Sequence, residues 1–425
     1  VSSMATANAS FELPPLPDYT LYPQPPLLSW ISDAHLALAL PVIGYWLVSG
    51  IFHFIDIYDL FPQYRLHTPA EILKRNPVTR WECFREVILQ HVIQTVFGIV
   101  MAWFDDEPTF GKDEYNVAWW AQNIRLAQRA IPVVLATAGL NPTALASNVA
   151  KSQPLLAAVL AGGQNMGLAP AFTSWELRVA QAVYYVAIPA MQFFVGILLV
   201  DTWEYFLHRA MHLNKWLYVT FHSRHHRLYV PYAYGALYNH PFEGFLLDTL
   251  GTGLAYLAVG MTTRQSMWFF TGCAIKTVDD HCGYKLPWDP LQRITSNNAA
   301  YHDIHHQSWG IKTNFSQPFF TFWDVWGGTM YKGNVTERYE RSRRSAEEKV
   351  EQDRAAQVDA KPTVIISAPG SDENAKPTPI SAPRSTRKKS SSISQSSGNW
   401  KGLRNIVNDN LQGKGGNVLG VESTH

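Results

Sequence analysis

Histidine is concentrated in one short part of this sequence. Of fifteen histidines in 425 residues, ten fall between residues 208 and 306, and eight of those stand in the spacings His-x-x-x-His or His-x-x-His-His. Imidazole is the commonest protein ligand for transition metals near neutral pH, and one tetrahedral ion takes at most about four protein ligands. The cluster therefore predicts two metal ions, held by His208, His212, His222, His225, His226, His240, His281, His302, His305 and His306.

The spacing places these histidines on shared helix faces. His208 and His212 are four residues apart, so they lie on one side of a helix that continues out of an apolar segment. The motifs at 222–226 and 302–306 also use intervals of three and four residues. Two helices that carry such motifs could face each other across a metal pair.

Polar residues near the motifs are candidates for supporting roles. Asp201 and Tyr205 precede His208 on one helical stripe, which predicts that they orient the imidazoles from behind. Further candidates for positioning ligands or binding a polar head group are Asn239, Asp279, Asp280, Asp303, Lys312 and Asn314. For the other histidines we expect ordinary surface or hydrogen-bonded core positions: His35, His53, His67, His91 and His425.

Apolar segments predict an all-α integral membrane protein. Leu36–Phe54, Val87–Phe104 and Val179–Val200 come close to the roughly 20 residues needed to cross a bilayer. Phe245–Met261 and Met267–Ile275 are shorter, and we expect them to form a hairpin that enters the membrane and returns. A returning hairpin keeps the histidines before and after it on one side, which a shared site requires. We expect about four transmembrane helices or hairpins with a histidine-rich helical cap.

Charged residues predict which side of the membrane the cap faces. Arg209, Lys215, Arg224 and Arg227 follow the span that ends at Val200, so the positive-inside rule places the histidines in the cytosol. The net charge of the whole chain is +1, and nothing in its balance indicates a nucleic-acid partner.

Composition divides the chain into three parts. Residues 1–34 are polar and Pro-rich, residues 35–330 hold the apolar segments and the histidines, with the catalytic part at 201–328, and residues 331–425 are charged and then rich in Ser and Pro. Apart from a short charged helix near its start, we expect the tail to be largely disordered. For the Ala- and Leu-rich segment 131–163, two interpretations stay open: an interfacial or membrane-embedded segment, or a loosely ordered insertion.

The ligand type alone leaves several metals open, because imidazole binds iron, zinc and copper. The membrane setting favours a redox metal. An unactivated C–H bond has neither an acidic proton nor a leaving group, so acid–base residues alone cannot attack it. A redox-active cofactor can carry that chemistry while the protein positions the substrate chain.

The histidine motifs resemble those of the membrane fatty acid hydroxylase superfamily, which includes sterol desaturases, sterol methyl oxidases and fatty acid 2-hydroxylases. The resemblance covers roughly residues 36–331. Four longer words are similar to the fungal sphinganine 4-hydroxylases: YNHPFEGFLLDTLGT (238–252), KTVDDHCGY (276–284), NNAAYHDIHH (297–306) and GIKTNFSQPFFTFWD (310–324).

That resemblance implies an O2-dependent oxidoreductase of the endoplasmic reticulum membrane, with two iron ions in the histidine site. It would hydroxylate C-4 of sphinganine or dihydroceramide to give phytosphingosine or phytoceramide. Electrons would come from NADPH through cytochrome b5 and its reductase as separate partners, because the chain contains no His-Pro-Gly-Gly haem motif and no Gly-x-Gly-x-x-Gly motif. Two alternatives stay open: a sterol or fatty-acyl desaturase or oxidase of the same superfamily, and a non-catalytic membrane protein that binds zinc.

Overall fold

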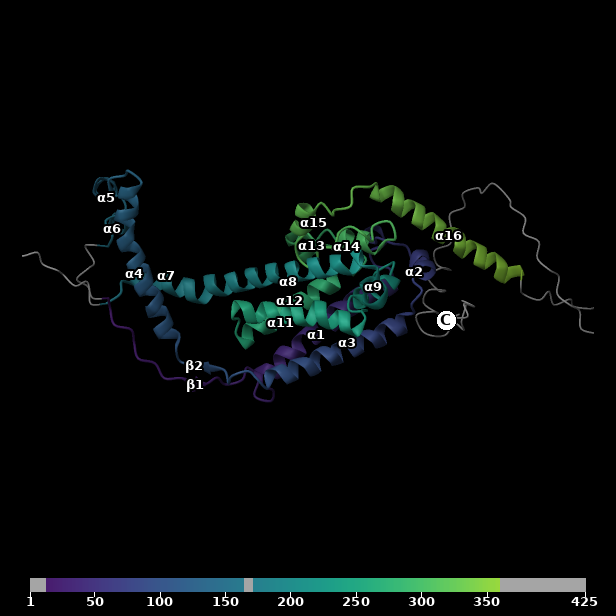
Figure 1. The fold of residues 1–425 in the computed structure, drawn as a ribbon, viewed down its shortest axis with the longest axis horizontal. Coiled ribbons are helices and arrows are strands. Elements are labelled where there is room, and N and C mark those ends of the chain that lie inside the picture. The colour runs from purple at the N-terminus through teal and green to yellow at the C-terminus, as the bar shows by residue number, and fades with distance from the viewer. Residues whose placement is uncertain (1–12, 164–170, 360–425) are drawn as a thin grey trace, which may run out of the picture.

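The computed structural model describes residues 13–163 and 171–359, and these residues are mostly helical (Figure 1). Within them, the one sheet is a short antiparallel pair, which confirms the all-α prediction. The strands are β1 (Tyr22–Pro23) and β2 (Thr109–Phe110). The α-helices are α1 (Asp33–Tyr58), α2 (Pro69–Arg75), α3 (Arg80–Ala102), α4 (Asp113–Thr137), α5 (Pro142–Val149), α6 (Pro154–Leu160), α7 (Ser174–Ala182), α8 (Ile188–Leu213), α9 (Lys215–Leu217), α10 (Pro241–Gly244), α11 (Gly251–Val259), α12 (Thr263–Asp280), α13 (Pro290–Ile294), α14 (Ala299–His306), α15 (Phe322–Gly327) and α16 (Val335–Asp359). Tighter or wider helical turns are η1 (Pro62–Tyr64), η3 (Val183–Ala187), η4 (Tyr218–His222), η5 (His225–Arg227), η6 (Ala233–Gly235) and η7 (Phe245–Leu250).

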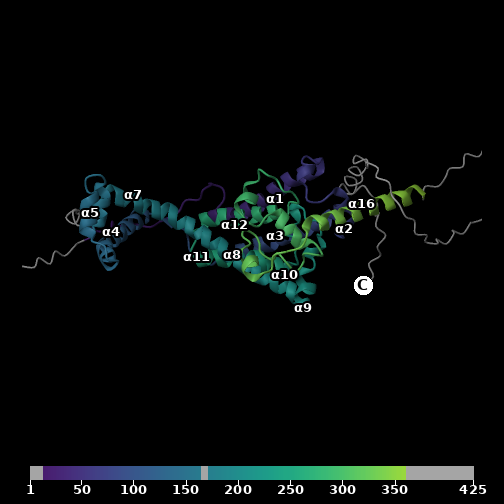
Figure 2. The ribbon, with the colours of Figure 1, turned by 90° about the horizontal axis from the view of Figure 1, so that it is seen from above.

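A bundle of α1, α3, α8, α11 and α12 forms the centre of the molecule (Figures 1 and 2). Among the described residues, three helices are long and apolar enough to cross a membrane: α1, α3 and the α7–α8 helix. On α1, Ile43, Leu47 and Ile51 are more than half exposed, and they lie at four-residue spacing on one face. An apolar face of this kind suits contact with lipid. At Gly44 of the same helix, a Cβ would stand 2.9 Å from the Thr271 side chain, so the missing side chain allows α1 and α12 to approach closely.

The hairpin predicted between residues 245 and 275 is confirmed. Its first limb is η7 followed by α11, and its second limb is α12. Gly260 ends the first limb with a φ of 64°, a left-handed conformation that glycine adopts without a steric penalty. Thr262 then caps α12 through the backbone of Gln265. Because the limbs pack against α8 and α1 respectively, both ends of the hairpin reach the histidine side of the bundle.

The first histidine pair extends from the longest helical segment, as predicted. Helices α7 and α8 form one segment from Ser174 to Leu213, 40 residues long. Pro189 follows the π-helical turn η3, whose wider ring accommodates a residue without a backbone N–H. At about 1.5 Å per residue this segment is roughly 60 Å long, about twice the thickness of a bilayer's hydrocarbon core. The segment is therefore long enough to cross such a layer and still extend its last turns, with His208 and His212, beyond it.

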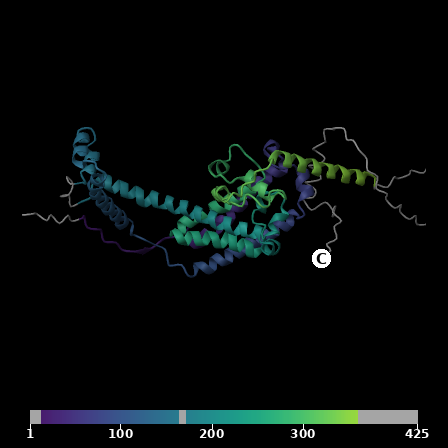
Figure 3. The same ribbon diagram turned by 45° about the horizontal axis from the view of Figure 1, so that its top comes forward.

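Helices α4–α7 stand apart from the bundle, at the opposite end of α8 from the histidines (Figure 3). A buried ion pair between Arg125 and Glu176 joins α4 to α7, with Arg125 Nε 3.0 Å from the carboxylate. Most of segment 131–163 is helical: it comprises the end of α4, then α5 and α6, with turns between them. Helices α4 and α5 meet at 114° and pass as a fourth, broken span only when taken together.

The charged helix predicted near the start of the tail is confirmed as α16, and it is longer than expected. Its Ala346 and Val350 pack against Ala70 and Leu73 of α2. The remainder of the predicted disordered tail, from residue 360, lies outside the described residues, as do residues 1–12.

Candidate metal centre

Nine of the ten predicted ligands converge at the end of the bundle, in two adjacent groups. Within each group, every histidine offers one ring nitrogen, all these nitrogens lie within 4.8 Å of one another, and every side chain is buried. Group A consists of His208, His212, His222, His226 and His305. Group B consists of His225, His281, His302 and His306.

Each His-x-x-His-His motif supplies ligands to both groups. His222 and His226 belong to group A, while His225, between them, belongs to group B. The motif at 302–306 does the reverse, giving its first and last histidines to group B and its middle one to group A. On a helix, positions i and i+4 are about 40° apart, and position i+3 lies about 60° to the other side of i. The motif therefore suits two neighbouring sites better than one.

The two motifs differ in backbone conformation. Residues 302–306 lie in α14, a regular α-helix, as predicted. Residues 222–226 do not form the predicted helix, because they pass from the π-helical turn η4 into the tight turn η5. The chain must reverse after α8, and Asn214 starts this reversal by accepting hydrogen bonds from the backbone of Trp216 and Leu217.

Backbone carbonyls fix the orientation of four imidazoles. A carbonyl oxygen only accepts, so each Nδ1 bonded to one must carry the proton, and the Nε2 of that neutral ring then presents a bare lone pair. These contacts join Nδ1 of His208 to Phe315 O (2.8 Å), of His281 to Thr277 O (2.8 Å), of His305 to Thr313 O (2.7 Å) and of His306 to Leu228 O (2.9 Å).

The Nε2 atoms point at one another, which is the strongest physical indication of a metal site. Contacting Nε2 atoms are 2.7–3.4 Å apart across both groups. Lone pairs at this separation repel unless a cation lies between them. Nitrogen atoms each about 2.0–2.1 Å from one ion stand about 3 Å apart when they occupy neighbouring ligand positions. The residues present therefore fit a metal ion in each group.

The groups are close enough to form one centre. The rings of His226 in group A and His306 in group B are 5.1 Å apart between centroids.

Burial lowers the pKa of His222 to about 3, so the ring is neutral near pH 7. Neutral rings are the form of histidine that binds metals.

Glu243 is a supporting residue that the sequence analysis missed. Its carboxyl group forms a hydrogen bond with Nδ1 of His222, and burial raises the pKa of this carboxyl to about 8. Glu243 lies within the word YNHPFEGF, three residues after His240 and directly before the apolar hairpin. An acidic residue at this position signals a helix start. Nothing local links it to His222, which is 21 positions away in the sequence.

Asp201 and Tyr205 do not contact an imidazole in the described structure, contrary to their predicted role. Asp201 accepts hydrogen bonds from the backbone N–H groups of Phe319 and Phe320, both at 2.9 Å. The hydroxyl of Tyr205 lies 3.1 Å from that of Thr329. Both side chains therefore hold the 315–329 segment against α8, and they affect His208 only through the Phe315 carbonyl on that segment.

Asp303 supports α14 from its outer side. Its carboxylate accepts from His67 at 2.9 Å and from Tyr339 of α16. The Glu71 carboxylate contacts the other nitrogen of His67 at 3.0 Å. Burial acts to lower the pKa of His67, but these two carboxylates outweigh it and raise the pKa to about 9. His67 is a hydrogen-bonded core residue, as expected, yet it braces the segment that carries three ligands.

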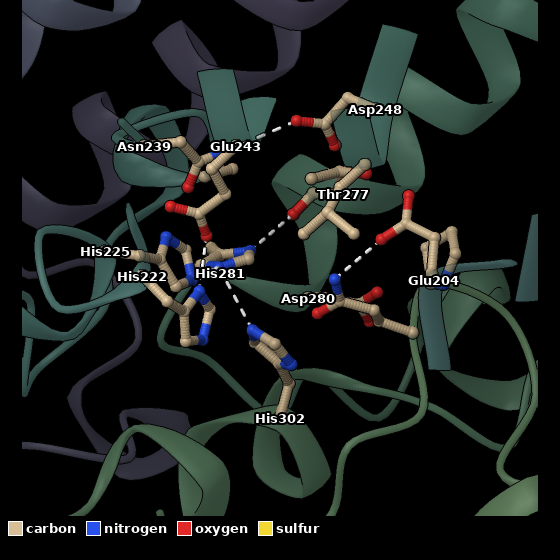
Figure 4. Close-up of a pocket in the computed structure, with 14 residues that line it drawn as sticks. Glu204, His222, His225, Asn239, Glu243, Asp248, Thr277, Asp280, His281 and His302 are labelled. Atoms are coloured by element: carbon tan, nitrogen blue, oxygen red, sulfur yellow. Dashed lines mark hydrogen bonds and ion pairs between the residues drawn. The ribbon is translucent and has the colours of Figure 1, made fainter. Parts of the chain in front are cut away.

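The other predicted supporting residues divide between the site and its surroundings. Asn239 and Asp280 line a small cavity beside group B (Figure 4). Asp279 instead accepts a hydrogen bond from Gln292. Asn314 joins the backbone of the chain at two other points, and Lys312 is exposed.

His240 is the one predicted ligand that lies outside both groups. It is the N-cap of α10, and its Nδ1 accepts a hydrogen bond from the backbone of Phe242 at 3.2 Å. Pro241 fixes the first position of that helix, so the preceding histidine takes the capping position. The imidazole is thereby turned to its own backbone, away from the other nine.

Comparisons with known proteins agree with this geometry. Residues 193–329 match the sequence profile described as Fatty acid hydroxylase. The chain is 44% identical to the sphingolipid C4-hydroxylase SUR2 of Saccharomyces cerevisiae over 81% of this chain and 88% of that protein. It is 40% identical to the sphingolipid C4-hydroxylase sur2 of Schizosaccharomyces pombe (75% and 95%) and 36% identical to sphinganine C4-monooxygenase 2 of Arabidopsis thaliana (72% and 92%). No solved structure matches the chain.

Proposed function

The chain belongs to the sphingolipid C4-hydroxylases of the fatty acid hydroxylase family, which are oxygen-dependent oxidoreductases, and we propose that it hydroxylates C-4 of sphinganine or dihydroceramide with two iron ions. The products would be phytosphingosine or phytoceramide. The observation that carries the metal part of the proposal is the convergence of nine buried histidines into two adjacent groups.

Groups A and B would each hold one iron ion. The iron pair would supply the oxygen-activating redox chemistry that an unactivated C–H bond requires. The protein's contribution is to orient the ligands: backbone carbonyls and Glu243 fix the imidazole rings so that their Nε2 lone pairs face inward. The centre is shielded from water, since all nine side chains are buried.

The fold brings a membrane lipid to this centre. Both limbs of the hairpin and α8 lead from the apolar bundle to the histidines, so a lipid tail can lie along apolar helices while its polar end reaches groups A and B. We propose a multi-pass position in the endoplasmic reticulum membrane with the histidines facing the cytosol. The cluster of Arg209, Lys215, Arg224 and Arg227 at that end of α8 supports this orientation.

We further propose that the electrons come from NADPH through cytochrome b5 and its reductase. Hydroxylation of R–H by O2 yields R–OH and water and consumes two electrons and two protons. An external donor would supply those electrons, since the sequence contains neither a His-Pro-Gly-Gly haem motif nor a Gly-x-Gly-x-x-Gly nucleotide motif.

Lipid mass spectrometry tests the proposal directly. Cells that lack the gene would receive either the wild type or a variant with His302→Ala, His305→Ala and His306→Ala. We expect 4-hydroxylated sphingoid bases to disappear on deletion and to return only with the wild type. Unchanged phytosphingosine together with altered sterols or fatty acids would indicate another oxidase of the same superfamily. An unchanged lipid profile would favour a non-catalytic metal-binding protein.

A further inference from the structure

The small cavity beside group B is lined by four carboxylates and three group B histidines (Figure 4). The carboxylates come from α8, α10, η7 and α12, so the fold brings together residues that are far apart in the sequence. The acidic residues are Glu204, Glu243, Asp248 and Asp280, and the group B histidines are His225, His281 and His302.

Two of these carboxylates already have a strong partner. Asp280 forms an ion pair with Lys276, which is fully buried. Glu243 bonds His222, as described above. Neither residue needs a further ligand to account for its burial.

The other two carboxylates have only neutral partners. Glu204 accepts from the amide of Gln317 at 2.6 Å, and Asp248 accepts from the amide of Asn239 at 3.3 Å. Neither forms an ion pair with any residue in the described part of the chain. Glu204 is only 4% exposed. A carboxylate taken out of water without a cation is costly, so a cationic group in this cavity would offset a cost that the chain itself leaves uncompensated.

A second feature of the cavity points to a polar ligand. His302 is 1% exposed, and its Nδ1 has no hydrogen-bond partner within residues 13–163 and 171–359. Its Nε2 faces the other histidines of group B. The Nδ1 is therefore left to bond a group that enters the cavity.

We propose that this cavity, with a volume of about 30 Å³, receives the ammonium group of a free, unacylated sphingoid base at Glu204 and Asp248, and that His302 Nδ1 donates to a hydroxyl oxygen of the same head group. The inference rests on the proposed function and narrows its substrate class. In sphinganine, C-4 is two bonds from the carbon that bears the amine and one bond from a carbon that bears a hydroxyl. A head group beside group B therefore brings C-4 to the metal centre. N-acylation replaces the cation with a neutral amide, which cannot compensate the two carboxylates.

The test compares sphinganine with N-acetylsphinganine, which has the same tail but no amine charge. Holoenzyme in nanodiscs would be assayed as the wild type and as Glu204→Gln, Asp248→Asn and the double variant, with Glu204→Asp as the variant that retains the charge. We expect the wild type to prefer sphinganine. In the Gln and Asn variants, the ratio of kcat/KM for sphinganine to that for N-acetylsphinganine should fall by about thirtyfold or more, mainly through KM. Glu204→Asp should recover part of the ratio.

Thermal stability provides a readout that does not depend on turnover. Sphinganine should raise the Tm of the wild type and not that of the double variant, while N-acetylsphinganine should affect both equally. Without lipid, the double variant should be at least as stable as the wild type, because it removes two buried acidic groups that no cation of the described chain compensates. A lower Tm with an unchanged substrate ratio would show that the carboxylates are structural and would overturn the proposal.

Two further outcomes would also overturn it. Equal losses with both lipids, accompanied by a larger solvent isotope effect, would assign the carboxylates to proton delivery. An unchanged ratio in every variant would exclude the ammonium contact while leaving C-4 hydroxylation intact. If the wild type hydroxylates neither lipid, the proposed function fails, and the Tm shift specific to the amine still decides whether the cavity binds it.

Discussion

Groups A and B differ more in their surroundings than in their ligands. Group A has five histidines, of which only His222 lines the cavity. Group B has four, and three of them line it. Group A is thus enclosed by protein, while group B borders the cavity. The two groups that the repeated motifs supply are therefore not equivalent: the surroundings of one are almost entirely protein, and the other also faces the cavity.

Removing a ligand should have the largest effect and should separate the two groups. We expect His208→Ala to remove the metal ion from group A and His302→Ala to remove it from group B. Each substitution should lower turnover by more than the roughly 10–100-fold that mutation of a residue hydrogen-bonded to a ligand costs. Metal analysis of the purified variants, with spectroscopy of the iron that remains, checks this. If either substitution removed both ions completely, the groups would form a single cooperative site, and the distinction between them would be lost.

Glu243→Gln should weaken group A selectively. Gln retains the shape but not the carboxyl group that fixes the His222 ring, so we expect metal affinity in group A to fall by about 10–100-fold while group B remains loaded. Metal titration with a competing chelator measures this. Glu176→Gln, the same change in a buried carboxylate at the far end of the α7–α8 helix, is the matched control and should leave both affinities unchanged. Equal losses from the two groups would contradict the selective role of Glu243.

Predictions from the sequence succeeded where the physical cause was local. The apolar runs gave α1, α3, α8 and the hairpin, and the four-residue interval placed His208 and His212 on one face. We predicted that the hairpin returns the chain to the side of the first histidines. That prediction required only the assumption that the histidines before and after the hairpin share one site. These features depend on the length of apolar runs and on the spacing of histidines, and both can be read from short stretches of the sequence.

Predictions failed where partners distant in sequence decide the structure. Asp201 lies on the predicted helical stripe, but its carboxylate accepts a hydrogen bond from the backbone N–H of Phe319 and contacts no imidazole in the described structure. The 222–226 motif has helical spacing, yet the reversal after α8 imposes a different backbone. Glu243 and the cavity carboxylates are brought together by four elements, and no spacing rule indicates such a meeting.

Substituting His67 should have a smaller effect, on the free energy of unfolding, and this effect should depend on pH. His67 braces the 302–306 motif, which supplies ligands to both groups. Its pKa is about 9 in the fold against about 6.5 in an unfolded chain. A raised pKa means that the protonated form is the one stabilised by folding. The contribution, about 3 kcal/mol, should be fully present below pH 6.5 and should be lost as the pH rises through about 9. Thermal unfolding of the wild type and His67→Gln between pH 6 and 10 measures it. The difference between the two should shrink with rising pH, and a constant difference would contradict the ion-pair interpretation.

His240→Asn should have the smallest effect, and it decides whether nine histidines or ten form the centre. Asn keeps the capping role, because its side-chain oxygen can accept the Phe242 N–H that His240 Nδ1 accepts at 3.2 Å. It removes the imidazole, which lies outside both groups. We therefore expect unchanged metal content and turnover within about twofold of the wild type, since the cap itself is preserved. A lost metal ion would show that His240 turns inward when the centre is loaded. Group A or group B would then have to be redefined to include it, and the sharper contrast between an enclosed group and one that faces the cavity would no longer hold.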